Sequence, residues 1–283
     1  MTSPIIQWYP GHIAKAEKQL LKNLEKIDLI IEVRDARIPR STSHPYIEKW
    51  ITNKKHLLII NRKDMISSQA LENWDQWFKS HDQMPLWCNA KLGDGVKQIK
   101  DAAVKAGADL NKRRQLRGMR DRPVRALTLG FPNVGKSALI NRLVQKKVVP
   151  SSRRAGVTRS LRWIRLGQSI DLLDAPGVLP PRLDDQKSAV KLAICDDIGQ
   201  AAYDVELVAI AFLKMLCEQN QNAIKIVPIL EKRYGITIES NDVGQWLSIA
   251  AHQHTSKDLR RMAQKLLDDF RKSMLGAIAL ELP

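Results

Sequence analysis

Residues 130–137 read Gly-Phe-Pro-Asn-Val-Gly-Lys-Ser, a GxxxxGKS motif that constrains the fold of this chain more than any other segment. An apolar, strand-like run precedes the motif and a helical pattern follows it, which is the context of a phosphate-binding loop. Gly130 and Gly135 allow backbone N–H groups to surround phosphate oxygens, and the helix N-terminus adds positive charge. Lys136 is expected to reach the β- and γ-phosphates, and Ser137 to bind Mg²⁺. The predicted nucleotide contacts of this loop are Asn133, Val134, Gly135, Lys136, Ser137 and Ala138.

A second motif, Asp-Ala-Pro-Gly at residues 174–177, follows another strand-like run. A DxxG motif after a phosphate-binding loop supplies an acid that holds Mg²⁺ through water, and the backbone N–H of Gly177 can approach the γ-phosphate. Between the two motifs, Thr158 lies in a glycine-containing loop and offers a hydroxyl to Mg²⁺ and the γ-phosphate. The predicted catalytic contacts of this region are Lys136, Thr158 and Gly177, and the predicted Mg²⁺ ligands are Ser137, Thr158 and Asp174.

Residues 61–64, Asn-Arg-Lys-Asp, follow an apolar run and have the composition of a guanine-binding loop. The carboxylate of Asp64 can accept the N1–H and the exocyclic amine of guanine together, and adenine has no such donor pair. Asn61 is expected to brace this loop against the phosphate-binding loop, and the stem of Arg62 to cover the base. A backbone N–H from residues 89–91 is expected to reach the guanine oxygen. The predicted base contacts are Asn61, Arg62, Lys63, Asp64, Asn89 and Ala90.

Apolar runs of strand length end where the suspected chemistry begins, and helical patterns lie between them. Alternation of this kind predicts an α/β fold with a mostly parallel, six-stranded sheet that binds ligands at the carboxyl ends of its strands. The guanine-binding loop precedes the phosphate-binding loop in the chain, so the strand order is predicted to be circularly permuted. The expected strands are residues 27–33, 56–60, 85–88, 125–129, 161–166 and 169–173.

Beyond about residue 190 the sequence shows helical patterns only. We expect a nucleotide-binding domain at residues 1–189 and a smaller, all-helical domain at residues 190–283. Residues 109–124 are polar and rich in arginine, and they are expected to form a basic linker within the first domain. The expected helices of the second domain are residues 204–217, 223–234, 243–251 and 256–271.

The net charge of +16 is concentrated near the phosphate-binding loop, because residues 105–165 contain 17 Lys or Arg and 2 Asp or Glu. Arginine predominates there, and its planar guanidinium suits phosphate, which favours a nucleic-acid partner over charge that only aids solubility. Three cysteines without metal-ligand spacing fit a reducing, cytoplasmic location, and no apolar run has the length of a membrane span.

These motifs resemble those of the circularly permuted GTPases that act late in assembly of the large (50S) ribosomal subunit. The resemblance also includes residues 8–16, Trp-Tyr-Pro-Gly-His-Ile-Ala-Lys-Ala, residues 35–39, Asp-Ala-Arg-Ile-Pro, and residues 268–272, Asp-Asp-Phe-Arg-Lys. It implies GTP and GDP as ligands, Mg²⁺ as cofactor, and an RNA-binding role for the helical domain. This chain departs from the family at two positions: Arg62 stands where the family usually has Lys, and Asn89 where it usually has Ser.

Val178 and Leu179 follow Gly177, so the chain lacks the glutamine that orients the attacking water in Ras-type enzymes. The resemblance implies that His12 positions this water instead, and a contact between His12 and RNA is the alternative. Asn133 resembles the residue of GTPases in which K⁺ stimulates hydrolysis. We therefore expect slow hydrolysis by the isolated protein and stimulation by the ribosomal subunit.

The expected partner is a precursor of the large ribosomal subunit, including its rRNA and ribosomal proteins. A membrane, DNA and a second copy of the chain are not expected as partners. Two other classes of function remain open. The protein could be an RNA-binding assembly factor that uses GTP and GDP as sensing ligands with little turnover, or a P-loop kinase or ATPase. The pairing of DxxG with a guanine-type loop argues against the second class.

Overall fold

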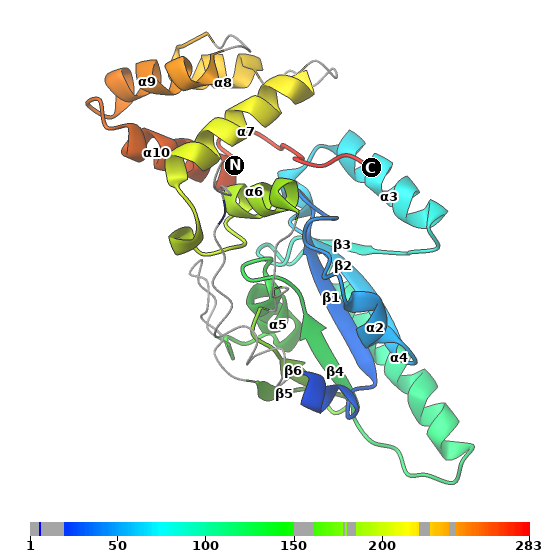
Figure 1. Ribbon diagram of the computed structural model, residues 1–283. Helices are drawn as coiled ribbons and strands as arrows, with labels where there is room; N and C mark the ends of the chain where they lie inside the picture. Colours follow the sequence, from blue (N-terminus) through cyan, green and yellow to red (C-terminus); the bar gives the residue numbers. More distant parts are fainter. Residues whose placement is uncertain are drawn as a thin grey trace. The chain divides into compact units, whose positions relative to one another are not determined.

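The computed structural model describes residues 6, 20–149, 161–177, 179, 185–220, 227–237 and 242–283. The chain divides into two compact units, coloured along the sequence in Figure 1. The sheet unit comprises Pro10–Arg182 and Glu281–Pro283, and the helical unit comprises Met1–Tyr9 and Leu183–Leu280. The division falls a few residues before the boundary expected at 189/190, and the last three residues of the chain belong to the sheet unit.

Six strands form one sheet in the sheet unit: β1 (Leu29–Asp35), β2 (Lys55–Asn61), β3 (Leu86–Cys88), β4 (Val124–Leu129), β5 (Arg162–Leu166) and β6 (Ile170–Asp174). Their order is β3-β2-β1-β4-β6-β5. All neighbouring pairs are parallel except β5 and β6, which form the expected antiparallel pair. The predicted α/β fold with a mostly parallel six-stranded sheet is therefore confirmed.

Strand β1 lies at the centre of the sheet, between β2 and β4, and all of its residues are buried. A central parallel strand is covered on both faces, which explains the buried apolar residues Leu29–Ile31 and Val33. Its other three residues are charged, and the carboxylate of Glu32 accepts a hydrogen bond from Arg34 at 2.6 Å and contacts His56 at 3.0 Å. These partners offset the cost of burying the charge.

The sheet unit also contains α2 (Ile47–Ile51), α3 (Ser68–Ser80), α4 (Val96–Gln115) and α5 (Lys136–Val144), together with the short 3₁₀ helix η1 (Lys63–Met65). Helix α4 packs so closely on β4 that a Cβ on Gly107 would lie 2.7 Å from Cγ2 of Val124. Leu127, Leu129 and Leu173 pack in one buried cluster with Trp50 of α2. Burial of each such side chain stabilises the fold by about 1.5–3 kcal/mol.

The expected linker at residues 109–124 is partly wrong, because residues 109–115 continue α4. Lys, Arg and Gln are good helix formers, and cations in the last turn of a helix interact favourably with its dipole. The high charge of this stretch therefore marks an exposed helix end, and only the residues after Leu116 form the irregular connection to β4.

The helical unit contains η2 (Gln200–Ala202), α6 (Gln186–Cys195), α7 (Val205–Asn220), α8 (Val227–Tyr234), α9 (Val243–His254) and α10 (Leu259–Arg271). Four aspartates accept backbone N–H groups at the starts of these helices and so satisfy donors that have no partner within the helix. They are Asp185, Asp204, Asp242 and Asp258. Among the described residues, no helix combines the length and the apolar character that a bilayer crossing requires.

The Asp-Asp-Phe-Arg-Lys segment at residues 268–272 holds the helical unit together. The buried Arg271 guanidinium donates to the carbonyl oxygens of Ile194 and Ala193 at 2.9 and 2.8 Å, at the C-terminal end of α6. The ring of Phe270 lies 4.8 Å from that of Phe212 on α7. Within the described residues, this segment is thus a structural junction between α6, α7 and α10.

Three donors converge on the carboxylate of Asp269 in the same segment. They are Arg233 Nε at 2.8 Å, the Tyr234 hydroxyl at 2.7 Å and Lys265 Nζ at 3.0 Å. Burial works against ionisation, but these donors outweigh it and lower the pKa of Asp269 to about 2. Because this pKa lies below that of an unfolded Asp, the stabilisation is complete above about pH 4 and is lost as the pH falls toward 2.

We expect Asp269→Asn to lower the free energy of unfolding at pH 7 by about 2 kcal/mol, since hydrogen bonds to a charged group are lost. The difference from the wild type should shrink as the pH falls from about 4 to about 2. Chemical denaturation followed by circular dichroism at several pH values measures both effects. The matched control is Asp268→Asn, whose side chain is 38% exposed. An equal loss in the two variants would contradict the assigned role.

Candidate functional site

The predicted loops all follow strands of the parallel part of the sheet. Residues 61–64 follow β2, residues 89–91 follow β3, residues 130–137 follow β4 and residues 174–177 follow β6. Carboxyl ends of parallel strands lie at one edge of a sheet, so these loops meet whatever their order in the chain. The permuted order of the motifs is therefore compatible with one nucleotide site.

The phosphate-binding loop needs glycine at both ends. Gly130 has φ +150°, and a Cβ there would lie 2.4 Å from the carbonyl oxygen of Val33. Gly135 has φ +102°, and its Cβ would lie 2.1 Å from Nδ2 of Asn61. Only glycine fits where the loop approaches β1 and the guanine-binding loop this closely.

Lys136 begins helix α5 and is buried within the phosphate-binding loop. Its ammonium donates to the carbonyl oxygens of Gly130 and Phe131 at 3.0 and 2.7 Å. A positive charge is thus held at the concave backbone of the loop, beside the positive end of the α5 dipole. An anion such as a nucleotide phosphate is the ligand that this arrangement favours.

Asn61 joins three loops through one buried side-chain amide. Its Nδ2 donates to the carbonyl oxygen of Val134 at 2.8 Å, and its Oδ1 accepts the backbone N–H of Ala90 at 2.9 Å. The thiol of Cys88 donates to the same oxygen at 3.4 Å. The expected brace between the guanine-type loop and the phosphate-binding loop is present, and it extends to residues 89–91.

Arg62 forms a second brace between the same loops. It adopts a left-handed backbone conformation, with φ 65°. Its guanidinium lies 3.0 Å from the carboxylate of Asp35 and donates a short hydrogen bond to the carbonyl oxygen of Asn133. Arginine can contact both groups because its planar fork has several donors, whereas a lysine ammonium is a single point of charge. The departure from the family's usual residue thus has a structural consequence at this position.

Asp35 is the buried anion of this brace, and prediction from sequence did not include it in the site. Arg37 Nη2 lies 2.7 Å from Asp35 Oδ2, the same oxygen that Arg62 contacts at 3.0 Å. Burial would raise the pKa of Asp35, but the two guanidinium groups outweigh burial and hold the pKa below its usual range. The signal in the sequence is an acid at the end of a buried strand, followed two residues later by an arginine.

Ion pairs and hydrogen bonds within and between the loops position the other predicted base contacts. Asp64 is exposed on η1, and Lys63 pairs with Asp94 at 2.7 Å. The side chain of Asn89 accepts the backbone N–H of Leu92 at 3.0 Å, so it shapes its own loop. Ala90 is buried where its N–H meets Asn61. A carboxylate and a fixed loop are therefore available for a base beside the phosphate-binding loop.

Asp174 and Gly177 approach the phosphate-binding loop from β6. A Cβ on Gly177 would lie 2.6 Å from Cα of Pro132, so the DxxG segment packs directly on the loop. Asp174 is buried, and its Oδ1 has no hydrogen-bond partner among the described residues. Burial raises the pKa of Asp174 to about 6, although the charges of Lys136 and Arg162 act in the opposite direction. A buried carboxylate oxygen of this kind fits a hard cation such as Mg²⁺.

Two predicted site residues, His12 and Thr158, lie outside the described part of the chain, and so does Val178, which follows the DxxG motif. Leu179, two residues after Gly177, is described and is buried. The ring of the buried His44 stacks on that of Trp50, with ring centroids 4.2 Å apart, and its centroid lies 6.3 Å from that of Phe131 in the phosphate-binding loop. Burial lowers the pKa of His44 to about 4, so this imidazole is neutral at pH 7.

Comparisons with known proteins identify the family of this chain. A family model described as 50S ribosome-binding GTPase matches residues 125–240. Ribosome biogenesis GTPase A of Bacillus cereus is 32% identical, with 99% of this chain and 94% of that protein covered. Ribosome biogenesis GTPase A of Bacillus pumilus is 34% identical, with 85% of this chain and 83% of that protein covered. The GNP-bound structure of YlqF from T. maritima has a TM-score of 0.64 at 21% identity, covering 95% of this chain and 98% of that one.

The fold and the site define a circularly permuted P-loop GTPase, which binds guanine nucleotide and hydrolyses GTP. The similarity to YlqF supports the fold, and the curated relatives extend over both units of the chain. The protein belongs to the ribosome biogenesis GTPase A family.

The Arg62 brace leads to a testable prediction. We expect Arg62→Ala to weaken binding of both GDP and GTP about tenfold, because Asn133 and the buried Asp35 lose a charged donor. Arg62→Lys should fall between the wild type and Arg62→Ala, since it keeps the charge and loses the fork. Titration with a fluorescent guanine nucleotide measures the affinity. Lys79→Ala, which removes an exposed ion pair with Asp75, is the control and should leave the affinity unchanged.

Proposed function

We propose that this GTPase binds precursors of the large ribosomal subunit and acts in a late step of their assembly. In this proposal, Mg²⁺-dependent hydrolysis of GTP is coupled to contact with rRNA and to release. The observation that carries it is the similarity to ribosome biogenesis GTPase A, which extends over 99% of this chain, including the helical unit. The matching family model is itself described as a ribosome-binding GTPase. Such a role places the protein in the cytoplasm.

The arrangement of the site supports the proposed cofactors. Ser137 and Asp174 would hold Mg²⁺ together with Thr158, and Mg²⁺ would supply positive charge to the phosphates. Asp64 would accept the two guanine donors, and the N–H of Ala90 would contact the guanine oxygen. The proposed nucleotide contacts are those of the three braced loops: Asn61, Arg62, Lys63, Asp64, Asn89, Ala90, Asn133, Val134, Gly135, Lys136, Ser137, Ala138 and Gly177.

The distribution of charge supports contact with RNA. Arg113, Arg117 and Arg120 are exposed at the end of α4 and in the connection that follows. Not every arginine of the basic stretch is available, because Arg122 pairs with Asp28 at 2.7 Å. We propose that the helical unit, residues 183–280, also contacts the ribosomal particle, since the curated relatives share it.

Co-sedimentation with large-subunit precursors tests the proposed function. We expect a larger bound fraction with a non-hydrolysable GTP analogue than with GDP, because only the GTP form has the γ-phosphate that Thr158 and Gly177 would contact. Asp64→Asn should weaken GTP binding about 100-fold, since it removes the acceptor of two guanine donors. At a fixed GTP-analogue concentration its bound fraction should fall to that seen with GDP. Equal binding by the wild type in both nucleotide states would contradict coupling between nucleotide and subunit.

A second candidate is an assembly factor that senses GTP and GDP with little turnover. Leu179 favours it, because a buried hydrophobic side chain after DxxG cannot orient water. Hydrolysis assays with and without precursors distinguish the two candidates. Stimulation by the precursor supports the coupled GTPase, and an equally slow rate in both conditions supports the sensor.

We further propose that His12 positions the attacking water and that K⁺ near Asn133 supports hydrolysis. We expect His12→Ala to lower the precursor-stimulated rate while the affinity for GTP stays nearly unchanged, since the histidine would act on water. The same assay in K⁺ and in Na⁺ at matched ionic strength should give the higher rate in K⁺. An unchanged rate in His12→Ala would assign the histidine another role, and equal rates with the two ions would exclude a specific effect of K⁺.

A further inference from the structure

A positively charged hollow lies beside the nucleotide site, between α4, α5 and the loop after β3. Its volume is about 1050 Å³. Of the described residues that line it, one, Asp101, is acidic, and six are basic. The basic residues are Lys91, Lys97, Lys100, Arg142, Lys146 and Lys147. We call this hollow the basic groove.

The walls of the basic groove are fixed by hydrogen bonds. Arg142 on α5 donates to the carbonyl oxygen of Lys91 at 2.6 Å, which ties the loop after β3 to the helix. On the same helix, Asn141 Oδ1 accepts the backbone N–H groups of Val148 and Val149, both at 2.9 Å. These bonds hold the turn that carries Lys146 and Lys147. The positive charges therefore project from a formed surface.

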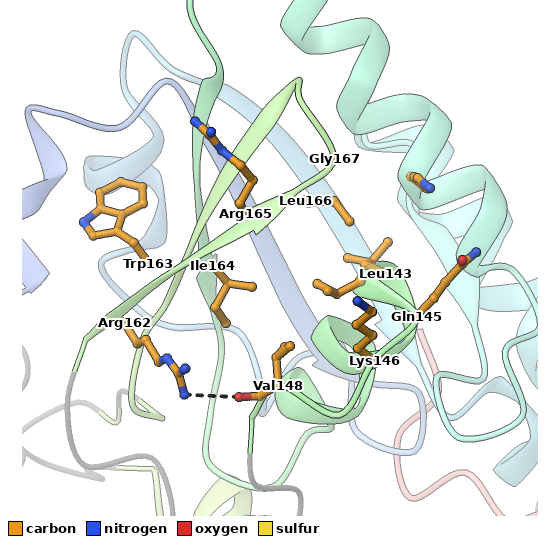
Figure 2. A pocket seen from close by; sticks show the side chains of 12 residues that line it. Leu143, Gln145, Lys146, Val148, Arg162, Trp163, Ile164, Arg165, Leu166 and Gly167 are labelled. Atoms are coloured by element: carbon orange, nitrogen blue, oxygen red, sulfur yellow. Dashed lines mark hydrogen bonds between the residues drawn. The ribbon is translucent and has the colours of Figure 1, made fainter.

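A second hollow of about 500 Å³ continues the basic groove toward β5, and the two share Lys100, Leu143, Gln145 and Lys146. Figure 2 shows Lys146 and Arg162 on this hollow, with Arg162 Nη1 bonded to the carbonyl oxygen of Val148 at 3.2 Å. Positive charge thus extends from the loop after β3, past the end of α5, to the edge strand. An elongated polyanion fits this path better than a small ion does.

The nucleotide itself does not account for these charges. Two of the proposed nucleotide contacts, Ala90 and Ala138, line the basic groove, but residues 130–137 of the phosphate-binding loop are not among its described lining residues. The phosphate-binding loop already has Lys136 and a helix N-terminus for the nucleotide phosphates. Within the described part of the chain, no acidic side chain forms an ion pair with Lys97, Lys100, Lys146 or Lys147. Like charges gathered without partners indicate a ligand that is not part of this chain.

We propose that the basic groove binds the phosphodiester backbone of rRNA next to the guanine nucleotide. This inference rests on the proposed ribosomal function and adds to it the surface that contacts RNA. Lysine is a compact point of charge that binds phosphate, and contacts to the phosphodiester backbone position a nucleic acid without specifying its sequence. One wall is the loop that carries Ala90, and the other is α5, which begins at the phosphate-binding loop and carries Ala138. RNA in the groove therefore lies beside two segments that carry proposed nucleotide contacts.

The test is a charge-reversal variant in which Lys97→Glu, Lys100→Glu and Lys146→Glu are combined. None of the three belongs to the proposed nucleotide contacts, so affinity for GTP and basal hydrolysis should stay within about twofold. Binding to large-subunit precursors and to an rRNA transcript should weaken at least about tenfold at moderate salt. The slope of log affinity against log salt should fall by about two to three, since each lost phosphate contact removes somewhat less than one counterion.

The matched control reverses the same number of charges on exposed lysines elsewhere in the sheet unit, with Lys22→Glu, Lys26→Glu and Lys49→Glu. The inference is supported if only the groove variant loses RNA affinity and salt dependence. An equal loss in both variants would overturn it, because net charge would then explain binding. A loss of GTP affinity specific to the groove variant would also overturn it, because the groove would then serve the nucleotide.

Two outcomes of these binding experiments distinguish a failure of this inference from a failure of the proposed function. If the wild type binds the rRNA transcript through the groove but does not bind the precursors, the proposed function fails and the groove assignment stands. If the wild type binds precursors and the groove variant binds them equally well, the function stands and the groove assignment fails. Vesicles containing phosphatidylserine test the other polyanion. Groove-dependent binding to these vesicles without binding to RNA would overturn the inference.

Discussion

The side-chain amide of Asn61 is the contact on which the nucleotide site depends. It donates to the phosphate-binding loop at Val134 and accepts from the loop after β3 at Ala90, so three loops from three strands share one buried group. Gly135 is required because its hydrogen faces this amide at a distance that no side chain would allow. A parallel sheet brings the loops to one edge, and the Asn61 hydrogen bonds then fix their separation. Chain order has no part in this arrangement, which is why a permuted sequence can form it.

Besides the Asn61 hydrogen bonds, a second and charged connection between the loops is formed by Arg62 and Asp35. Asp35 is buried between two guanidinium groups, and one of them, that of Arg62, also holds the backbone of Asn133. The loop after β1 is in turn bound by the end of the chain, since the carboxylate of Glu281 accepts the N–H of Arg40 at 2.8 Å. The C-terminal residues that follow the helical unit are thus anchored to the part of the sheet unit that braces the nucleotide site.

Charge is used in two distinct ways around this site. Arg37 is buried and Arg62 is half-buried, and both direct their guanidinium groups to fixed oxygens, so they build the fold. Lys97, Lys146 and Lys147 are exposed along the basic groove and make no ion pair with other described residues. The number of Lys and Arg residues in the sequence does not distinguish the cations that bond to fixed oxygens from the exposed ones. Burial and partners separate the charges that stabilise the protein from those that face a polyanion.

The sequence by itself determined the fold class, the phosphate-binding loop and the permuted order of the motifs, because glycine spacing and apolar runs reflect local geometry and burial. It did not place Asp35 in the site or show that Asp269 and Arg271 are structural, since the contacts with Arg62, Arg233 and Ile194 that decide this join residues far apart in the chain. It also assigned residues 109–115 to a linker, because high charge suggested a loop where an exposed helix end occurs. Only the tertiary structure decided which arginines are buried and which lysines line one groove. The physical reason is that burial and ion pairing belong to contacts between elements, and these contacts exist only after the chain has folded.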